Sequence, residues 1–318
     1  MSKTYIGQII ESVNAVTENC GPVLLFGANI DTGSKISGLA RGLKVNSEGR
    51  ILNVGNCELT HIGVGLGMML DGGKAVVFMK QLDFLLLGVD QMVNTFTLIR
   101  SFHRPEELGS FTVFVIVCDQ GYQGVQSSLN AAGDLASLAN VDVFCLNTAD
   151  DAAHVVGDKF VAPGFRVVCV SQRLFGAPTL DLPVEWRAPD NSAFKFRSGS
   201  NITMVCFGFS LRDGVALAER LSQAGVESDV FHVNYVPGMD MSTVFDSCVR
   251  TGRIALIDDT KSVVKFGDML VSTLSARGLD VGVLSLGRRG CTSEEYGVAE
   301  DRFVPDYDAV LEFARAGD

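Results

Sequence analysis

The sequence contains no hydrophobic run long enough to cross a membrane and no cluster of basic residues. Even the apolar stretch 113–117 has only the length of a buried strand, and the first residues lack the apolar core of a signal peptide. The formal net charge of −11 disfavours nucleic acid and anionic membranes as partners. We therefore expect a cytoplasmic protein that binds neither nucleic acid nor membrane.

Metal-binding and phosphate-binding signatures are also lacking. The eight cysteines are scattered without a zinc spacing, and the four histidines have no metal-ligand spacing, so both are expected to be mainly structural. Neither a P-loop nor a GxSxG elbow occurs. The stretch Gly63-Val64-Gly65-Leu66-Gly67 is GxGxG within a helical segment, which indicates close helix packing and not a dinucleotide fingerprint. No metal ligand is assigned to this chain.

Short β-rich runs alternate with helix-like segments through both halves of the 318 residues. The pattern predicts strands at 23–26, 50–54, 75–79, 112–118, 141–145, 166–170, 202–207, 228–233, 253–257 and 280–285. It predicts helices at 6–16, 59–70, 85–100, 131–138, 211–224, 241–251 and 263–276. The expected class is α/β, with two domains that each contain a mainly parallel sheet covered by helices on both faces.

Between the two halves lies a segment rich in turn-forming residues and without a clear period. It contains Pro183, Pro189, Asp190 and Asn191. We place the first domain at residues 1–185, a linker at 186–200 and the second domain at 201–318.

The residues that indicate chemistry follow two of the predicted strands. Glu58 opens a glycine-rich helix just after the strand at 50–54, and Gln81-Leu82-Asp83-Phe84 follows the strand at 75–79. Open α/β sheets place their ligands at such carboxyl ends. Each residue alone also has a simpler explanation, because helix dipoles favour acidic residues in the first turn and a phenylalanine usually packs in a core.

The combination resembles the beta subunits of the decarboxylase component of 2-oxo acid dehydrogenases and, more distantly, transketolase. The family has a glutamate that opens a glycine-rich helix, then a strand, an aromatic residue and a helix with an Asp-Gln-x-Val/Ile-Asn signature. Asp90-Gln91-Met92-Val93-Asn94 matches that signature. In the second half, Val249-Arg250-Thr251-Gly252-Arg253 resembles the Lys-Thr-Gly-Arg turn of the family. The resemblance implies a pyrimidine-binding domain followed by a transketolase C-terminal-like domain.

The resemblance also implies a cofactor, thiamine diphosphate with Mg²⁺, and a role for two residues. Glu58 would hydrogen-bond N1′ of the aminopyrimidine and so help the cofactor to lose its C2 proton, and Phe84 would stack on the pyrimidine ring. The diphosphate and magnesium motif, GDG…N, is missing, because Gly133-Asp134-Leu135 lacks the third glycine. We therefore expect an alpha-type subunit to carry that motif in an α2β2 heterotetramer, with an acyl carrier or lipoyl domain as a further partner.

One departure from the family concerns the loop after the strand at 112–118. The family has a substrate-contacting histidine there, and Ser128 stands in its place, so Gln123, Gln126 and Ser128 are the candidate substrate contacts. Asp258-Asp259 likewise replaces a common His-Glu pair. These changes disfavour ordinary pyruvate dehydrogenase activity, and transketolase-type ketol transfer and 2-oxo acid decarboxylation or acyl transfer both stay open. A non-catalytic structural or regulatory partner that retains the fold is the alternative, and a flavin or nicotinamide oxidoreductase is disfavoured by the missing phosphate fingerprint.

Overall fold

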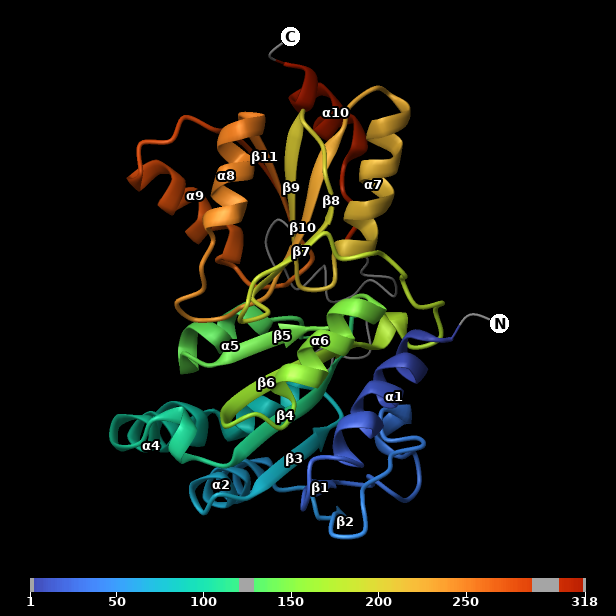
Figure 1. Cartoon of the computed structure of the whole chain (residues 1–318), viewed down its shortest axis with the longest axis vertical. Coiled ribbons are helices and arrows are strands. Elements are labelled where there is room, and N and C mark those ends of the chain that lie inside the picture. The colour runs from blue at the N-terminus through green and yellow to red at the C-terminus, as the bar shows by residue number, and fades with distance from the viewer. Residues whose placement is uncertain (1–2, 120–128, 288–302, 317–318) are drawn as a thin grey trace.

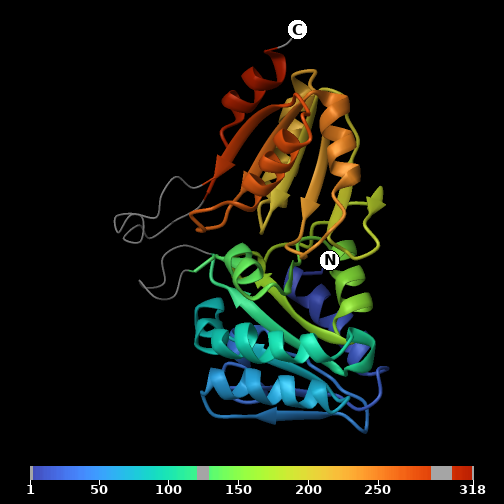
Figure 2. The same cartoon turned by 90° about the vertical axis from the view of Figure 1, so that its left-hand side faces the viewer.

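The computed structural model describes residues 3–119, 129–287 and 303–316. They fold into two domains stacked along the long axis, with the N-terminal domain below and the C-terminal domain above in Figure 1. Each domain contains a six-stranded sheet with helices on both faces (Figures 1 and 2). The predicted α/β class and two-domain architecture are thus confirmed.

The first sheet is wholly parallel and has the strand order β2-β1-β3-β4-β6-β5. Its strands are β1 (Leu24–Gly27), β2 (Arg50–Asn53), β3 (Lys74–Met79), β4 (Ser110–Val117), β5 (Asp142–Cys145) and β6 (Gly164–Ser171). β4 and β6 are buried along their whole length, as expected for central strands covered on both faces.

Two groups of helices cover this sheet. One face carries α2 (Glu58–Leu70), α3 (Leu82–Leu85), α4 (Phe96–Phe102) and α5 (Ala132–Ala139), and the other carries α1 (Tyr5–Thr17) and α6 (Ala149–Lys159). Alternate residues of a strand serve the two faces: on β3, Val77 joins the core under α2, whereas Val76 and Phe78 join the core under α1 and α6. The sequence pattern did not predict α6, because acidic residues and alanines dominate it and obscure its apolar period.

The second sheet has the order β12-β11-β9-β10-β8-β7. Its strands are β7 (Trp186–Arg187), β8 (Ala193–Arg197), β9 (Ile202–Phe207), β10 (Ser228–Val233), β11 (Arg253–Asp258) and β12 (Gly282–Gly287). β9 to β12 are parallel, whereas β7 and β8 form an antiparallel edge. One face carries α7 (Leu211–Gln223) and α10 (Tyr307–Arg315), and the other carries α8 (Ser242–Thr251) and α9 (Phe266–Ala276).

The segment expected as a linker, 186–200, contributes two strands to the second sheet. It contains β7 and β8, and β8 pairs with β10. The turn residues at 189–191 obscured the strand pattern in the sequence, although Phe194 and Phe196 on β8 are buried in the core of the second domain. The domain boundaries drawn from the sequence remain predictions.

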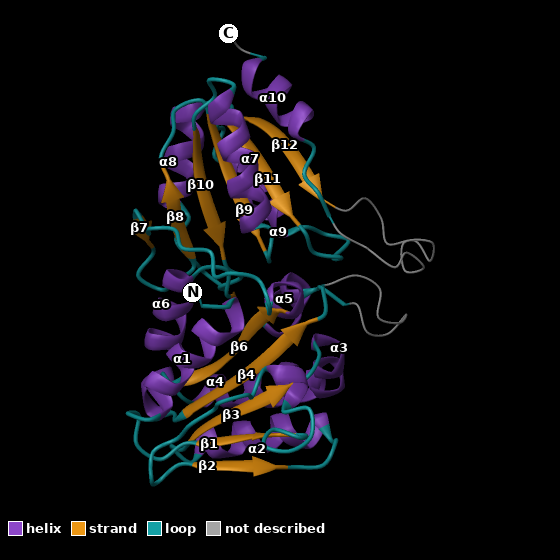
Figure 3. Ribbon diagram, turned by 90° about the vertical axis from the view of Figure 1, so that its right-hand side faces the viewer, coloured by secondary structure: helices purple, strands orange, loops and turns teal. Residues whose placement is uncertain are grey.

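The carboxyl ends of the second sheet point toward the first domain (Figure 3), and the two domains share hydrogen bonds there. Tyr235, just after β10, forms an antiparallel bridge with Val143 on β5, with N···O distances of 2.9 and 3.0 Å in the two directions. The buried side chain of Asn234 accepts a hydrogen bond from the Cys145 amide at 2.8 Å and donates to Asn191 O at 3.0 Å. The two domains are therefore joined by an interface with specific hydrogen bonds and not only by a flexible linker.

No single helix among the described residues is long and apolar enough to span a membrane. The segments Leu82–Gly88 and Gln91–Phe102 reach that length only together, with a bend of 61° at the break. Their largest apolar residues, among them Leu82, Leu85 and Met92, are buried against the first sheet.

Candidate functional site

The carboxyl ends of β1, β2 and β3 form the edge of the sheet where the predicted residues lie. β1 and β3 are neighbours in the sheet. The strand that follows β1 in the chain, β2, lies toward one edge of the sheet, whereas the strand that follows β3, β4, lies toward the other edge. The direction of winding reverses between β1 and β3, and open α/β sheets bind ligands in the crevice at such a reversal. Glu58 follows β2 and Phe84 follows β3, so both lie at this edge.

Glu58 is half-buried and is the first residue of α2. The loop before it is tied to the helix, because Nε2 of the buried His61 lies 2.8 Å from the carbonyl oxygen of Gly55. The Sγ of Cys57 is 2.9 Å from Oγ1 of Thr60, which holds the other side of the same turn. These contacts fix the start of α2 and with it the backbone of Glu58, and they give His61 the structural role expected of it.

Phe84 lies next to α2 because of a close approach between two backbones. A Cβ built on Gly88, four residues after Phe84, would lie 2.5 Å from Cγ1 of Ile62 and 3.5 Å from the carbonyl oxygen of Glu58. Only glycine allows this approach. The half-buried ring of Phe84 packs against the same core as Ile62. The structure thus brings the turn that directly follows Phe84 into contact with α2, the helix that begins at Glu58.

The stretch predicted as a helix at 85–100 is helical throughout but is not one regular α-helix. It contains a 3₁₀ turn η2 (Leu86–Gly88), a π-helical turn η3 (Gln91–Thr95) and α4, and it bends by 61° after Gly88, which packs on α2. The π turn covers most of the Asp-Gln-x-Val-Asn signature, and such turns are frequent at functional sites. Gln91 lies against Gly63 of α2 and accepts a hydrogen bond from Thr95 at 2.7 Å. The signature therefore packs the π turn η3 against α2, the helix that begins with Glu58.

Asp83 and Cys118 also lie at this edge. Asp83 belongs to the stretch noted in the sequence but was given no role of its own, and Cys118 was not singled out. Oδ1 of Asp83 accepts a hydrogen bond from the Leu129 amide at 3.2 Å, and burial raises the pKa of this carboxyl. Burial also raises the pKa of Cys118 to about 11, although its thiol bonds to the buried side chain of Gln81. Their position directly after the buried strands β3 and β4 was the signal that could have singled them out.

The predicted substrate contacts Gln123, Gln126 and Ser128 lie outside the described residues, so they stay predictions. Leu129 and Asn130, which follow them, are held from two sides. Asp83 of the first domain accepts from Leu129, and in the second domain the Lys261 amide donates to Asn130 O at 2.7 Å.

A buried ionic cluster connects the two domains at the ends of their sheets. Arg173 forms ion pairs of 3.4–3.6 Å with Asp119, Asp213 and Asp259. Burial raises the pKa of Asp259 to about 7, and its Oδ1 accepts a hydrogen bond from the Phe209 amide at 2.9 Å. Asp259, which replaces an acid of the family pattern, therefore supports the domain junction.

His232 has a structural position at the same junction. It is fully buried, and its Nε2 lies 3.1 Å from Gly208 O and 3.0 Å from Nδ2 of Asn147. Burial lowers the pKa of His232 to about 4, so the ring is neutral at physiological pH. The nearby Asp151 caps α6 through the amide of Thr148, and burial raises its pKa to about 7.

Most of the cysteines in the described part of the chain are in the buried positions that the sequence predicted. All seven cysteines in the described part of the chain are free, and five of them are buried in the cores. The described residues contain no group of three or more His, Cys, Asp or Glu side chains that could hold a metal ion.

A carboxyl group and a half-buried aromatic ring at one edge fit a flat heteroaromatic ring with a basic nitrogen. The carboxyl can hydrogen-bond the nitrogen, and the aromatic ring can cover one face of the heterocycle. The same edge shows carboxylates at Glu58 and Asp83, which do not suit a diphosphate. The residues at this site thus fit the pyrimidine end of thiamine diphosphate and not its diphosphate end.

Comparisons with known proteins agree with the architecture. Residues 193–310 match the family model described as "Transketolase, C-terminal domain". The beta subunit of acetoin:2,6-dichlorophenolindophenol oxidoreductase from Cupriavidus necator is 20% identical over 229 residues, which cover 72% of this chain and 68% of that protein. The beta subunit of the pyruvate dehydrogenase E1 component from Staphylococcus aureus is 21% identical over 320 residues, 98% of this chain and 97% of that one.

Among solved structures, a split-gene transketolase described as an inactive beta4 tetramer superposes with a TM-score of 0.70 at 16% identity. The match covers 99% of this chain and 98% of that chain. Because it extends over nearly the whole of both chains, the order and packing of both domains are shared.

Proposed function

This chain is transketolase-like, and its residues 193–310 match the model of the transketolase C-terminal domain. On that premise we propose that it is the beta-type subunit of a split thiamine diphosphate-dependent enzyme. The enzyme would cleave or form a C–C bond next to a carbonyl, and this chain would supply the pyrimidine half of the active site. The observation that carries the proposal is the position of Glu58 at the start of α2, at the winding reversal of the sheet and beside the turn that directly follows Phe84.

Glu58 would act by holding a proton at N1′ of the pyrimidine. The bound cofactor supplies the electron sink for the reaction. The chain positions its carboxyl by fixing the start of α2, through His61 and Gly55 on one side and through Gly88 on the other. Phe84 would fix the plane of the ring. A carboxyl held on a rigid helix start loses little freedom when it binds, which favours proton transfer.

The diphosphate and Mg²⁺ would be held by an alpha-type partner. Support comes from exposed apolar side chains on the elements that form the site, since exposed apolar surface is typical of interaction faces. They belong to β2, α2 and η2: Leu52, Leu59, Val64, Leu86 and Leu87. The two curated relatives are named as beta subunits, and the split-gene transketolase is described as inactive as a beta4 tetramer. We therefore propose that this chain is inactive alone and works in the cytoplasm in an α2β2 assembly.

Two reactions of this class remain to be distinguished: transketolase-type ketol transfer, and 2-oxo acid decarboxylation with acyl transfer to an acyl carrier or lipoyl domain. A substrate screen with ketose phosphates and 2-oxo acids separates them. The alternative of a non-catalytic partner predicts no turnover with either class.

The test is to measure thiamine diphosphate and Mg²⁺ binding by calorimetry for this chain, for the protein encoded next to it, and for the two together. Tight binding by the complex alone supports the shared site, and tight binding by this chain alone contradicts it. Glu58→Gln should lower turnover of the complex by about 100-fold or more, the usual contribution of a positioned acid or base, and leave assembly intact.

A matched control uses the same substitution elsewhere. Glu106→Gln changes an exposed glutamate on η4 (Pro105–Glu107), before β4 and thus at the opposite edge of the sheet, and should leave turnover unchanged. If the Glu58→Gln complex kept its turnover, the role proposed for Glu58 would be wrong.

A further inference from the structure

A second concave site lies at the junction of the two domains. A cavity of about 720 Å³ opens between α5 of the first domain and the connections β10–α8 and β11–α9 of the second. The volume is in the range of small-molecule sites. None of its lining residues belongs to α2 or α3, so it is separate from the candidate site around Glu58.

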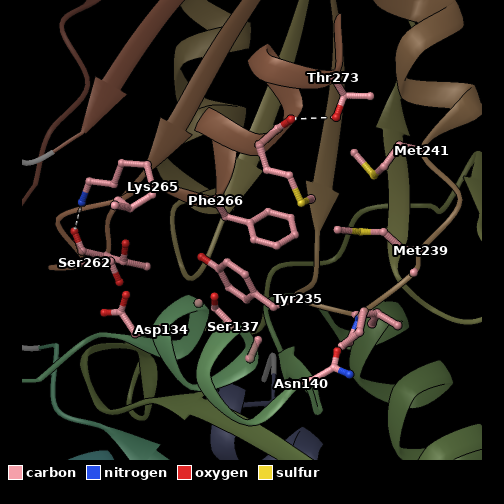
Figure 4. Close-up of a pocket in the computed structure, with 18 of the residues that line it drawn as sticks. Asp134, Ser137, Asn140, Tyr235, Met239, Met241, Ser262, Lys265, Phe266 and Thr273 are labelled. Atoms are coloured by element: carbon pink, nitrogen blue, oxygen red, sulfur yellow. Dashed lines mark hydrogen bonds between the residues drawn. The ribbon is translucent and has the colours of Figure 1, made fainter. Parts of the chain in front are cut away.

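One wall of the cavity is apolar and adaptable. Its members come from the second domain: Met239, Met241, Phe245, Phe266 and Met269. Methionine side chains adjust to irregular ligands and contact aromatic rings favourably. Figure 4 shows Met239, Met241 and Phe266 on one side of the cavity, opposite Asp134, Ser137 and Asn140.

The inner end of the cavity is polar and rigid. The hydroxyl of Tyr235 is buried and has no hydrogen-bond partner among the described residues, and the same is true of the Ser262 hydroxyl. Both residues line the cavity, and the Tyr235 hydroxyl lies on the side of Ser262 (Figure 4). The ring of Tyr235 is fixed edge-on to Phe266 with centroids 4.6 Å apart, and a Cβ on Gly133 would lie 2.8 Å from it.

Buried hydroxyl groups in proteins nearly always have a partner. Two of them on residues that line a cavity of this size therefore indicate a polar group bound beside them. A hydroxyl can both donate and accept, so a hydroxyl, carbonyl or amide would satisfy it.

The charges around the cavity favour a neutral ligand. Its lining contains two acids, Asp134 and Asp240, and two bases, Lys265 and Arg277. The guanidinium of Arg277 lies over the ring of Phe245, 4.4 Å from its centroid, and the ammonium of Lys265 donates to Thr260 O at 2.5 Å. Burial and the nearby carboxylate of Asp258 raise the pKa of Tyr235 well above its usual range, so an anionic group is disfavoured at this end.

We propose that this cavity binds a small neutral amphipathic molecule. Its aromatic or branched apolar body lies against the methionines and Phe266, and its one hydroxyl, carbonyl or amide bonds to Tyr235 and Ser262. The ligand would contact both α5 and the second domain. It is distinct from thiamine diphosphate and from the substrate at Glu58.

The test uses three probes that differ only in their polar end: p-cresol, toluene and 4-methylbenzoate. Each is titrated into the full chain and followed by ligand-observed NMR. We expect p-cresol to bind about fivefold more tightly than toluene, the factor expected for one neutral hydrogen bond, and 4-methylbenzoate to bind least. Tyr235→Phe should remove the preference for p-cresol, and Ser137→Trp, which fills the cavity from α5, should weaken p-cresol and toluene at least tenfold.

Two control variants carry the same substitutions outside the cavity. Tyr307→Phe changes a tyrosine on α10, and Leu138→Trp changes an exposed residue of α5 that does not line the cavity; neither should alter binding. Tyr235→Phe removes a hydroxyl without a protein partner, so it should fold with an unchanged or higher unfolding midpoint.

The proposal is overturned if the wild-type chain shows no saturable p-cresol binding, or if Tyr235→Phe binds the three probes as the wild type does. The comparison of Tyr235→Phe with the wild type remains decisive even if Ser137→Trp fails to fold. None of these measurements involves thiamine diphosphate, so they can fail while the proposal for Glu58 succeeds, and the reverse.

Discussion

Replacing Gly65 by alanine tests how the helix that presents Glu58 is fixed to the sheet. Gly65 lies in the middle of α2, and a Cβ built on it would be 2.1–2.4 Å from three ring carbons of Phe111 on β4. Carbon atoms in contact lie ~3.5–4.0 Å apart, so the helix or the ring must move by roughly 1.5 Å. The ring has little room to move, because it is stacked on Phe165 with centroids 5.1 Å apart.

The expected loss of stability follows from two opposing contributions. Overpacking a core costs about 1–3 kcal/mol, whereas alanine is favoured over glycine inside a helix by about 1 kcal/mol. We expect Gly65→Ala to lower the free energy of unfolding by up to about 2 kcal/mol. Gly67→Ala is the matched control, since Gly67 is exposed on the same helix and its Cβ would meet nothing within 4 Å. That variant should raise the free energy of unfolding by about 0.5–1 kcal/mol.

The assay is urea unfolding of the full chain followed by circular dichroism, with both variants compared at one temperature. Gly65→Ala should be less harmful in a Phe111→Leu background, because the smaller side chain leaves space for the new methyl group. If Gly65→Ala were as stabilising as Gly67→Ala, α2 would not be packed on β4 as described. The placement of Glu58 at the edge of the sheet would then lose its structural basis.

Two further predictions concern the domain junction. The pKa of Asp259 is raised to about 7 in the folded chain and is about 4 in an unfolded one, so the folded state loses stability as the pH rises between these values. Asp259→Asn should remove this decline, so between about pH 5 and pH 8 its free energy of unfolding should rise by on the order of 2 kcal/mol relative to that of the wild type. The measurement is urea unfolding of both proteins at each pH. Parallel curves of stability against pH would contradict the prediction. Asn234→Ala leaves the buried Cys145 amide without its acceptor and should cost about 1–3 kcal/mol, measured by thermal unfolding, and a loss near zero would mean that this bond does not join the domains.

Periodicity identified the strands because a buried parallel strand is a short run of β-branched and aromatic residues. The strand predicted at 112–118 is Ser110–Val117, and the strand predicted at 202–207 is Ile202–Phe207. The stretch predicted as a helix at 85–100 is helical, but the sequence did not predict its 3₁₀ and π turns or its bend after Gly88, since only contact with α2 explains them. β7 and β8 were missed for a related reason: their pairing with β10 is not visible in a local pattern.

The position of Glu58 in the chain, after a strand and at the start of a glycine-rich helix, was visible in the sequence. The resemblance to transketolase-like beta subunits depended on the order of short motifs, which sequence preserves, and the comparisons support it. The roles of Glu58 and Phe84 themselves stay predictions that the Glu58→Gln experiment tests.

The sequence by itself determined the α/β class, the two-domain organisation and the edge of the sheet at which the candidate residues follow their strands, because these properties follow from local hydrophobic patterns and turn residues. Only the tertiary structure decided which distant residues meet. It placed Gly88 against Ile62, grouped Asp119, Asp213 and Asp259 around Arg173, and enclosed the cavity at Tyr235 between α5 and the second domain. The physical reason is that such contacts join segments far apart in the chain, and their geometry is fixed by the packing of whole elements, which no local pattern encodes.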